Sequence, residues 1–152
     1  MSLRDWELSN YELRGGNYPV GVETMSDFGD ILEGKCMNFS VRIVNLCRFL
    51  TEEKKEYRIA DQLFRSGTSI GANVAEAQCA ISRNDFVAKL YIALKESNES
   101  IYWIDLLFNT QCLTREQYDS IRKDCVELKK LLVTITKSAR NNQIATSLQR
   151  NS

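Results

Sequence analysis

Apolar residues recur at intervals of three and four along most of this chain, which is the spacing of one face of an α-helix. The pattern predicts helices over about residues 30–50, 57–80, 82–109 and 114–137. No proline follows Pro19, so long helices are not interrupted. Helices of this length joined by short polar connections pack economically as an all-α, up-down-up-down antiparallel four-helix bundle.

Capping signals mark the predicted helix boundaries. Three N-cap residues and their reciprocal partners are expected: Asp30 with Glu33, Ser82 with Asp85, and Thr114 with Gln117. Two hydrophobic staples are expected beside them: Ile81 with Phe86, and Leu113 with Tyr118. We expect the last helix to fray somewhere past Lys137.

The second predicted helix is crowded with small residues in the run RSGTSIGANVAEAQCA. A glycine in a helix interior costs about 1 kcal/mol relative to alanine, so Gly67 and Gly71 predict that another backbone approaches closely. One face of the same helix is polar and holds Arg65, Ser69, Asn73 and Glu76. Such residues could line a ligand site, but they equally form hydrogen bonds across a helix or subunit interface. We favour the structural interpretation.

The third predicted helix has apolar residues on a second face. Four of them lie away from the stripe that starts at Phe86: Ile92, Trp103, Leu106 and Leu107. A bundle has one interior, and apolar surface elsewhere on a helix typically marks a contact with another chain. The pattern therefore predicts self-association.

The first 29 residues contain the only proline and four of the seven glycines, and they lack a sustained helical period. They also contain Trp6, Tyr11 and Tyr18, more aromatic residues than a simple tail needs. We expect an N-terminal arm over residues 1–29, either flexible or docked, then the bundle over residues 30–141 and a tail over residues 142–152.

The composition of the chain argues against most kinds of catalytic site and metal site. Histidine is absent, which excludes the commonest general base and metal ligand and also the Glu-x-x-His pairs of bundle di-iron sites. The five cysteines form no CxxC pair, as expected of reduced thiols in the cytoplasm. No apolar run reaches the length of a membrane span, and the start MSLRDWEL is unlike a signal peptide. We predict no catalytic residues, no cofactor, no metal and no membrane partner.

Charge is balanced overall, with 20 basic and 20 acidic residues, but it is one-sided at the end of the chain. Five basic residues and no acidic ones follow Glu127: Lys129, Lys130, Lys137, Arg140 and Arg150. A basic patch is an electrostatic footprint for RNA or DNA. Basic residues at a helix C-terminus also complement the helix dipole, which is the interpretation we favour.

The run RSGTSIGANVAEA, followed by DFVAKLYIALKESNES, resembles the four-helix bundle proteins encoded within intervening sequences of bacterial large-subunit (23S) rRNA genes. The resemblance covers about residues 30–140 and is most specific at Arg65, Ser66, Ser69, Asn73 and Glu76. Members of this family, and the similar accessory proteins of diversity-generating retroelements, form ring-shaped homopentamers. The resemblance therefore implies a pentamer. No enzymatic activity or cofactor is established for the ribosomal group.

These inferences predict a non-catalytic oligomeric protein that acts as an interaction or scaffold protein. Nucleic acid, or an enzyme that acts on nucleic acid, is the candidate partner. The similar accessory proteins are strongly basic and bind nucleic acid, whereas this chain is neutral overall. The alternative is an enzyme whose site is assembled between subunits.

Overall fold

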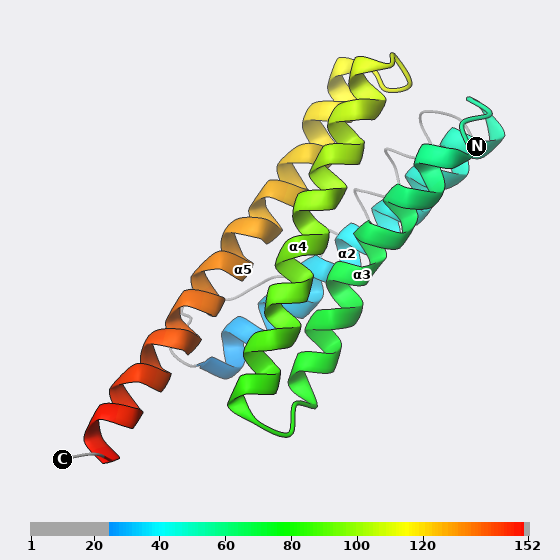
Figure 1. Ribbon diagram of the computed structural model, residues 1–152. Coiled ribbons are helices and arrows are strands. Elements are labelled where there is room, and N and C mark those ends of the chain that lie inside the picture. The colour runs from blue at the N-terminus through cyan, green and yellow to red at the C-terminus, as the bar shows by residue number, and fades with distance from the viewer. Residues whose placement is uncertain (1–24, 151–152) are drawn as a thin grey trace.

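The computed structural model describes residues 25–150, and it describes side chains for residues 29–141. This part of the chain forms four helices and no strand: α2 (Met25–Glu52), α3 (Arg58–Gln78), α4 (Arg83–Asn109) and α5 (Arg115–Arg150). Consecutive helices run in opposite directions (Figure 1). The predicted all-α bundle of antiparallel helices is confirmed.

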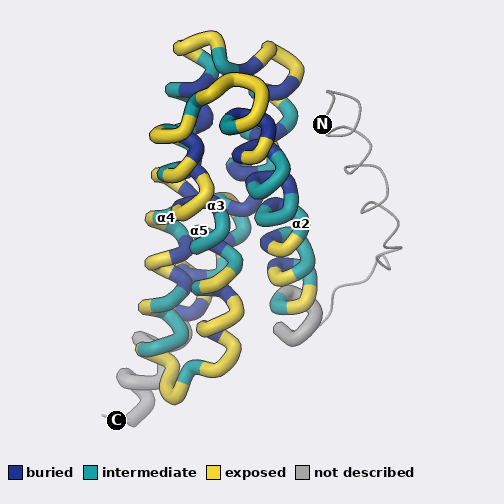
Figure 2. Tube along the Cα trace, turned by 90° about the vertical axis from the view of Figure 1, so that its right-hand side faces the viewer, coloured by how far each residue is buried: buried dark blue, intermediate teal, exposed yellow. Residues whose placement is uncertain are grey.

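Each helix packs against two neighbours in a closed cycle. The neighbouring pairs are α2 with α3, α3 with α4, α4 with α5, and α5 with α2, whereas the backbones of α2 and α4 do not come close to each other. Figure 2 shows α2 and α4 on opposite sides of the bundle, with α3 and α5 between them. The outer surfaces of α2 and α4 therefore face in opposite directions.

The predicted apolar stripes form the core. The largest fully buried side chains come from all four helices: Phe39, Ile43, Leu46, Leu50, Leu63, Ile70, Leu90, Ile104, Leu107, Ile121, Leu128 and Leu132. Burying a side chain of this size stabilises the fold by about 1.5–3 kcal/mol. Cys36, Cys47 and Cys125 are buried among them, as expected for thiols on apolar stripes.

The small residues of α3 allow a close approach of α2. A Cβ atom added to Gly67 would lie 2.9 Å from Cγ1 of Ile43. At Gly71 it would lie 3.2 Å from Oγ of Ser40 and 3.4 Å from Cβ of Cys36. A close contact at these glycines is confirmed, and the neighbour is α2. Its nearest atoms belong to side chains, and the nearest backbone atom given is the carbonyl oxygen of Cys36, 3.7 Å from a Cβ atom on Gly71.

Two helices are longer than their patterns predicted. Helix α2 begins at Met25, so Asp30 lies inside the helix and the predicted N-cap there is wrong. Residues 25–29, assigned to the arm, are helical, and Trp6, Tyr11 and Tyr18 lie outside the described residues. Helix α5 continues to Arg150 and includes residues 142–150 of the expected tail. Neither proline nor glycine follows Lys137, so no residue there breaks a helix.

The start of α5 has the predicted capping box. The Gln117 N–H donates to Oγ1 of Thr114 over 3.2 Å, and the Thr114 N–H donates to Oε1 of Gln117 over 2.9 Å. At the start of α4, Ser82 accepts from the Asp85 N–H over 3.1 Å, but the Asp85 carboxylate accepts from Ile81 instead of Ser82. Ile81 is 95% exposed, so the predicted staple with Phe86 is wrong.

Candidate interaction surfaces

Three polar residues of the family motif in α3 make contacts within the bundle. Ser66 is buried, and its hydroxyl accepts from the Ser100 hydroxyl of α4 over 3.0 Å. Asn73 donates to the carbonyl oxygen of Ser69 over 2.8 Å, and Glu76 forms an ion pair with Lys89 of α4. These contacts hold α3 to α4 or brace α3 itself, and they lie at separate points along the helix.

Arg65 is the most exposed member of this set. Its guanidinium lies 3.9 Å from the Asp61 carboxylate one turn earlier, with both side chains well exposed. Exposed pairs of this kind contribute little to stability. The two most exposed residues of the family motif are therefore Arg65 and Glu76, whose side chains are 72% and 58% exposed.

Apolar and aromatic side chains gather on the outer surface of α4 around the charged Lys95 and Glu99, and we call this group the α4 face. It consists of Tyr91, Ile92, Tyr102, Trp103 and Leu106, of which the first three are exposed and the other two are half-buried. The Tyr102 and Trp103 rings meet edge to face with centroids 4.9 Å apart. The Trp103 indole N–H donates to Glu99 over 3.1 Å. The two rings and Glu99 therefore contact one another on this face.

Leu107 does not belong to the α4 face. It is fully buried in the core of its own chain, so its assignment as an interface candidate is wrong. Leu107 comes seven residues after Ser100, two turns along the helix, and Ser100 contacts α3. The same spacing places Leu107 on the inner side of α4.

Helix α5 has five basic side chains on and beside its outer surface, and we call this group the α5 cation face. It contains the four residues expected from the sequence and one more: Lys129, Lys130, Lys137, Arg140 and Lys123. Lys129 is half-buried and the other four are exposed. Lys123, Lys130 and Lys137 recur every seven residues, about 10 Å apart along one side of the helix.

Acidic residues near this face are engaged by other cations. The ion pairs are Asp105 with Arg122 at 2.8 Å, Asp119 with Arg115 at 3.7 Å, Glu127 with Lys35 at 2.7 Å, and Asp124 with Arg42. The five side chains of the α5 cation face form no ion pair within residues 29–141. Sequence reasoning missed Lys123 because it precedes Glu127, whose pairing with Lys35 only the fold reveals.

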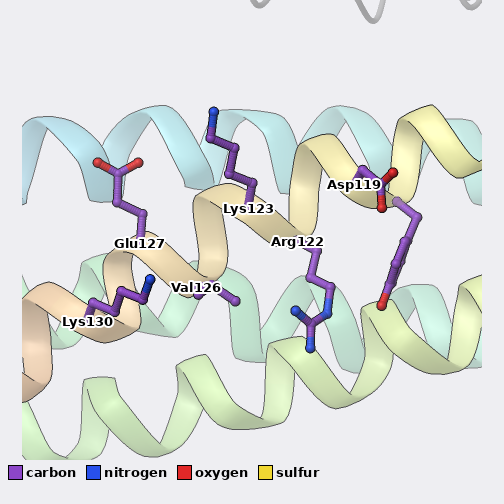
Figure 3. Close-up of a pocket in the computed structure, with 7 residues that line it drawn as sticks. Asp119, Arg122, Lys123, Val126, Glu127 and Lys130 are labelled. Carbon is purple, nitrogen blue, oxygen red and sulfur yellow. The ribbon is translucent and has the colours of Figure 1, made fainter.

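A groove of about 440 Å³ runs along the same helix. Its lining comes from α5 alone: Tyr118, Asp119, Arg122, Lys123, Val126, Glu127 and Lys130. In Figure 3, Arg122 extends to one side of the helix, and Lys123 and Glu127 extend to the other. The side chains diverge, so the groove is open and does not enclose a small molecule.

An ion pair that the sequence analysis missed connects α2 to α5. The Arg42 side chain is only 8% exposed, pairs with Asp124, and donates from Nη2 to Oγ of Ser120 over 2.8 Å. The sequence could have indicated that Arg42 is buried, because it is three residues after Phe39 and four before Leu46, on the buried stripe of α2.

The buried thiols are poorly suited to nucleophilic chemistry. The pKa of Cys36, Cys47 and Cys125 is raised to about 12, chiefly by burial and, for the first two, also by a nearby carboxylate. Within the described side chains, no group of three or more cysteine, aspartate or glutamate residues is placed to hold a metal ion. Across residues 25–150, every helix lacks an apolar stretch long enough to cross a bilayer.

Comparison with known proteins agrees with the fold. The family described as 23S rRNA-intervening sequence protein matches residues 32–134. A crystal structure of a protein of unknown function from the S23 ribosomal protein family of Bacteroides thetaiotaomicron VPI-5482 is similar, with 53% sequence identity and a TM-score of 0.72. The similarity covers 72% of this chain and 98% of that chain. No curated protein matches. With the family matched over most of the helical bundle, this chain belongs to the 23S rRNA-intervening sequence protein family.

Proposed function

We propose that this protein is a non-catalytic interaction or scaffold protein that works as a self-associating, ring-shaped homo-oligomer in the cytoplasm. The observation that carries the proposal is the α4 face. Tyr102 is 59% exposed on it, next to the exposed Tyr91 and Ile92. Aromatic residues are enriched in protein interfaces, and apolar patches are usually covered in a soluble assembly.

We further propose that the ring is a homopentamer, because the proteins that this chain resembles assemble from five subunits. Light scattering tests this proposal. The expected mass is five times the chain mass of 17.5 kDa and is stable on dilution. A mass of 17.5 kDa at every concentration would contradict self-association.

A matched pair of variants tests the role of the α4 face. Tyr102 and Tyr57 are both 59% exposed, but Tyr57 lies just before α3, away from the α4 face. Tyr102→Ser is expected to lower the oligomer mass at a given concentration. Tyr57→Ser removes the same exposed ring and is expected to leave the mass unchanged. Equal behaviour of the two variants would show that the α4 face has no special role.

The α5 cation face favours a second candidate function, the binding of RNA or DNA. Its five cations span about 26 Å of helix from Lys123 to Arg140. In a ring, the same surface would recur on every subunit. Repeated weak phosphate contacts gain affinity from their high effective concentration. A chain with no net charge would bind a polyanion in this way, either alone or beside an enzyme that acts on nucleic acid.

The alternative, an enzyme with a site assembled between subunits, has less support. Within the described residues, Glu76 is paired with Lys89 and Asp61 lies beside Arg65. The buried thiols stay protonated at neutral pH because their pKa is about 12. We therefore assign contact with macromolecules, and not catalysis, to this fold.

A further inference from the structure

Helix α2 has a second apolar stripe, on the opposite side of the bundle from the α4 face. Met37 is 65% exposed, Val41 and Val44 are half-buried, and Arg48 is exposed. These residues are spaced by four, three and four, so they share one side of the helix. We call this stripe the α2 face.

Two apolar surfaces on opposite sides restrict how copies of this chain can assemble. A two-fold dimer uses one surface twice, and it would leave the second surface exposed to water. A head-to-tail contact places one surface of a subunit against the other surface of its neighbour, and it covers both. Met37 on α2 is 65% exposed and Tyr102 on α4 is 59% exposed, so within the described residues no other helix of the chain covers either surface.

Charges on the two surfaces are complementary. Glu96 and Glu99 lie near the middle of α4, and neither forms an ion pair within the described residues, even with the intervening Lys95. The pKa of Glu96 is raised by burial and, to a smaller extent, by repulsion from Glu99. Arg48, on the α2 face, is a cation without an ion pair in the same part of the chain.

We propose that the α4 face of one subunit packs against the α2 face of the next, with Arg48 of one chain beside Glu96 and Glu99 of the other. The inference rests on the proposed self-association and specifies which surfaces meet. Head-to-tail contacts of this kind close into a ring when the rotation between subunits permits it.

Two variants, each damaging one surface, test the pairing. The first carries Ile92→Glu and Tyr102→Glu on the α4 face, and the second carries Met37→Glu and Val41→Glu on the α2 face. Each is expected to be monomeric alone, because a glutamate in an apolar contact is not solvated. An equimolar mixture is expected to form a heterodimer and nothing larger, since one contact joins the two intact surfaces. Light scattering and native mass spectrometry measure both results.

The outcomes separate this inference from the proposed function. A monomeric parent would overturn self-association itself. If the parent assembles but the second variant alone keeps the parent's mass, the α2 face is not part of the contact. A mixture of folded variants that stays monomeric would overturn the pairing as well. Circular dichroism confirms that each variant is folded.

A charge reversal provides a test that does not depend on placing glutamates in apolar surfaces. Arg48→Glu is expected to raise the protein concentration needed for assembly by about tenfold or more, because three carboxylates would then meet. Adding Glu99→Arg to Arg48→Glu is expected to restore assembly. An unchanged mass profile for Arg48→Glu on dilution, or no rescue by the second change, would overturn the proposed charge contact.

Discussion

Gly67 of α3 lies directly against Ile43 of α2, so close that a Cβ atom on Gly67 would be 2.9 Å from both Cγ1 and Cγ2 of Ile43. Ile43 is fully buried, and its β-branched side chain has little rotamer freedom in a helix. It cannot move aside without disturbing the core. The absence of a side chain at Gly67 therefore sets the distance between α2 and α3.

Gly67→Ala is expected to destabilise the protein although alanine is the better helix former. Helix propensity favours alanine by about 1 kcal/mol, but overpacking a tight contact typically costs about 1–3 kcal/mol. We expect a net loss of about 1 kcal/mol in the free energy of unfolding, measured by urea denaturation at one protein concentration. A second variant, Ile43→Ala, removes the clashing atoms, and in that background Gly67→Ala should no longer destabilise. A more stable Gly67→Ala single variant would contradict the close-contact interpretation.

Substitutions at Gly71 are expected to destabilise the protein by amounts that depend on the size of the new side chain. Its nearest neighbour, the Ser40 hydroxyl at 3.2 Å, can rotate, so Gly71→Ala is expected to cost less than Gly67→Ala. Gly71→Leu adds a branched side chain against Ser40 and Cys36, and it is expected to destabilise by about 1–3 kcal/mol. Thermal melting ranks the variants. A melting temperature for Gly71→Leu above that of the parent would exclude close packing at this site.

The ion pairs between α2 and α5 should differ in strength because they differ in burial. Asp124→Ala leaves Arg42, whose side chain is 8% exposed, without its carboxylate, and we expect a loss of about 2 kcal/mol or more. Glu127→Ala breaks the exposed pair with Lys35, and we expect a loss of less than about 1 kcal/mol. Urea unfolding of both variants measures the difference. Equal losses would mean that the burial of Arg42 has no energetic consequence.

Much of the fold could be predicted from the sequence because helical periodicity and capping are local properties. Thr114 and Gln117 form the expected capping box, and the glycines of α3 meet a close neighbour. Features that depend on neighbouring helices were harder to predict. Leu107 looks like surface in the sequence until the side of α4 that meets α3 is known. The pairing of Glu127 with Lys35 joins residues 92 positions apart.

The buried thiols predict a loss of stability at high pH. In the unfolded chain a thiol has a pKa near 9, whereas burial raises the folded-state pKa of Cys125 to about 12. The folded-state pKa is the higher one, so this contribution is fully present below pH 9 and is lost as the pH rises towards 12. Replacing Cys125 with alanine should reduce the stability lost between pH 8 and pH 10 by about 1 kcal/mol. The control is Cys79→Ala, because Cys79 is exposed. Identical pH profiles for the two variants would contradict the prediction.

The last prediction concerns the α5 cation face. If phosphate contacts form there, Lys130→Gln together with Lys137→Gln should weaken binding to RNA and DNA and lower the slope of log affinity against log salt concentration. Lys54→Gln with Lys55→Gln is the matched control, since it removes the same charge from exposed lysines in the turn between α2 and α3. Binding is measured between about 50 and 200 mM salt, after light scattering has shown that the oligomer mass is unchanged. Equal weakening by both pairs would indicate a general effect of charge and not a specific face. No binding by the parent at low salt would remove nucleic acid as a partner and leave a protein partner for the α5 cation face.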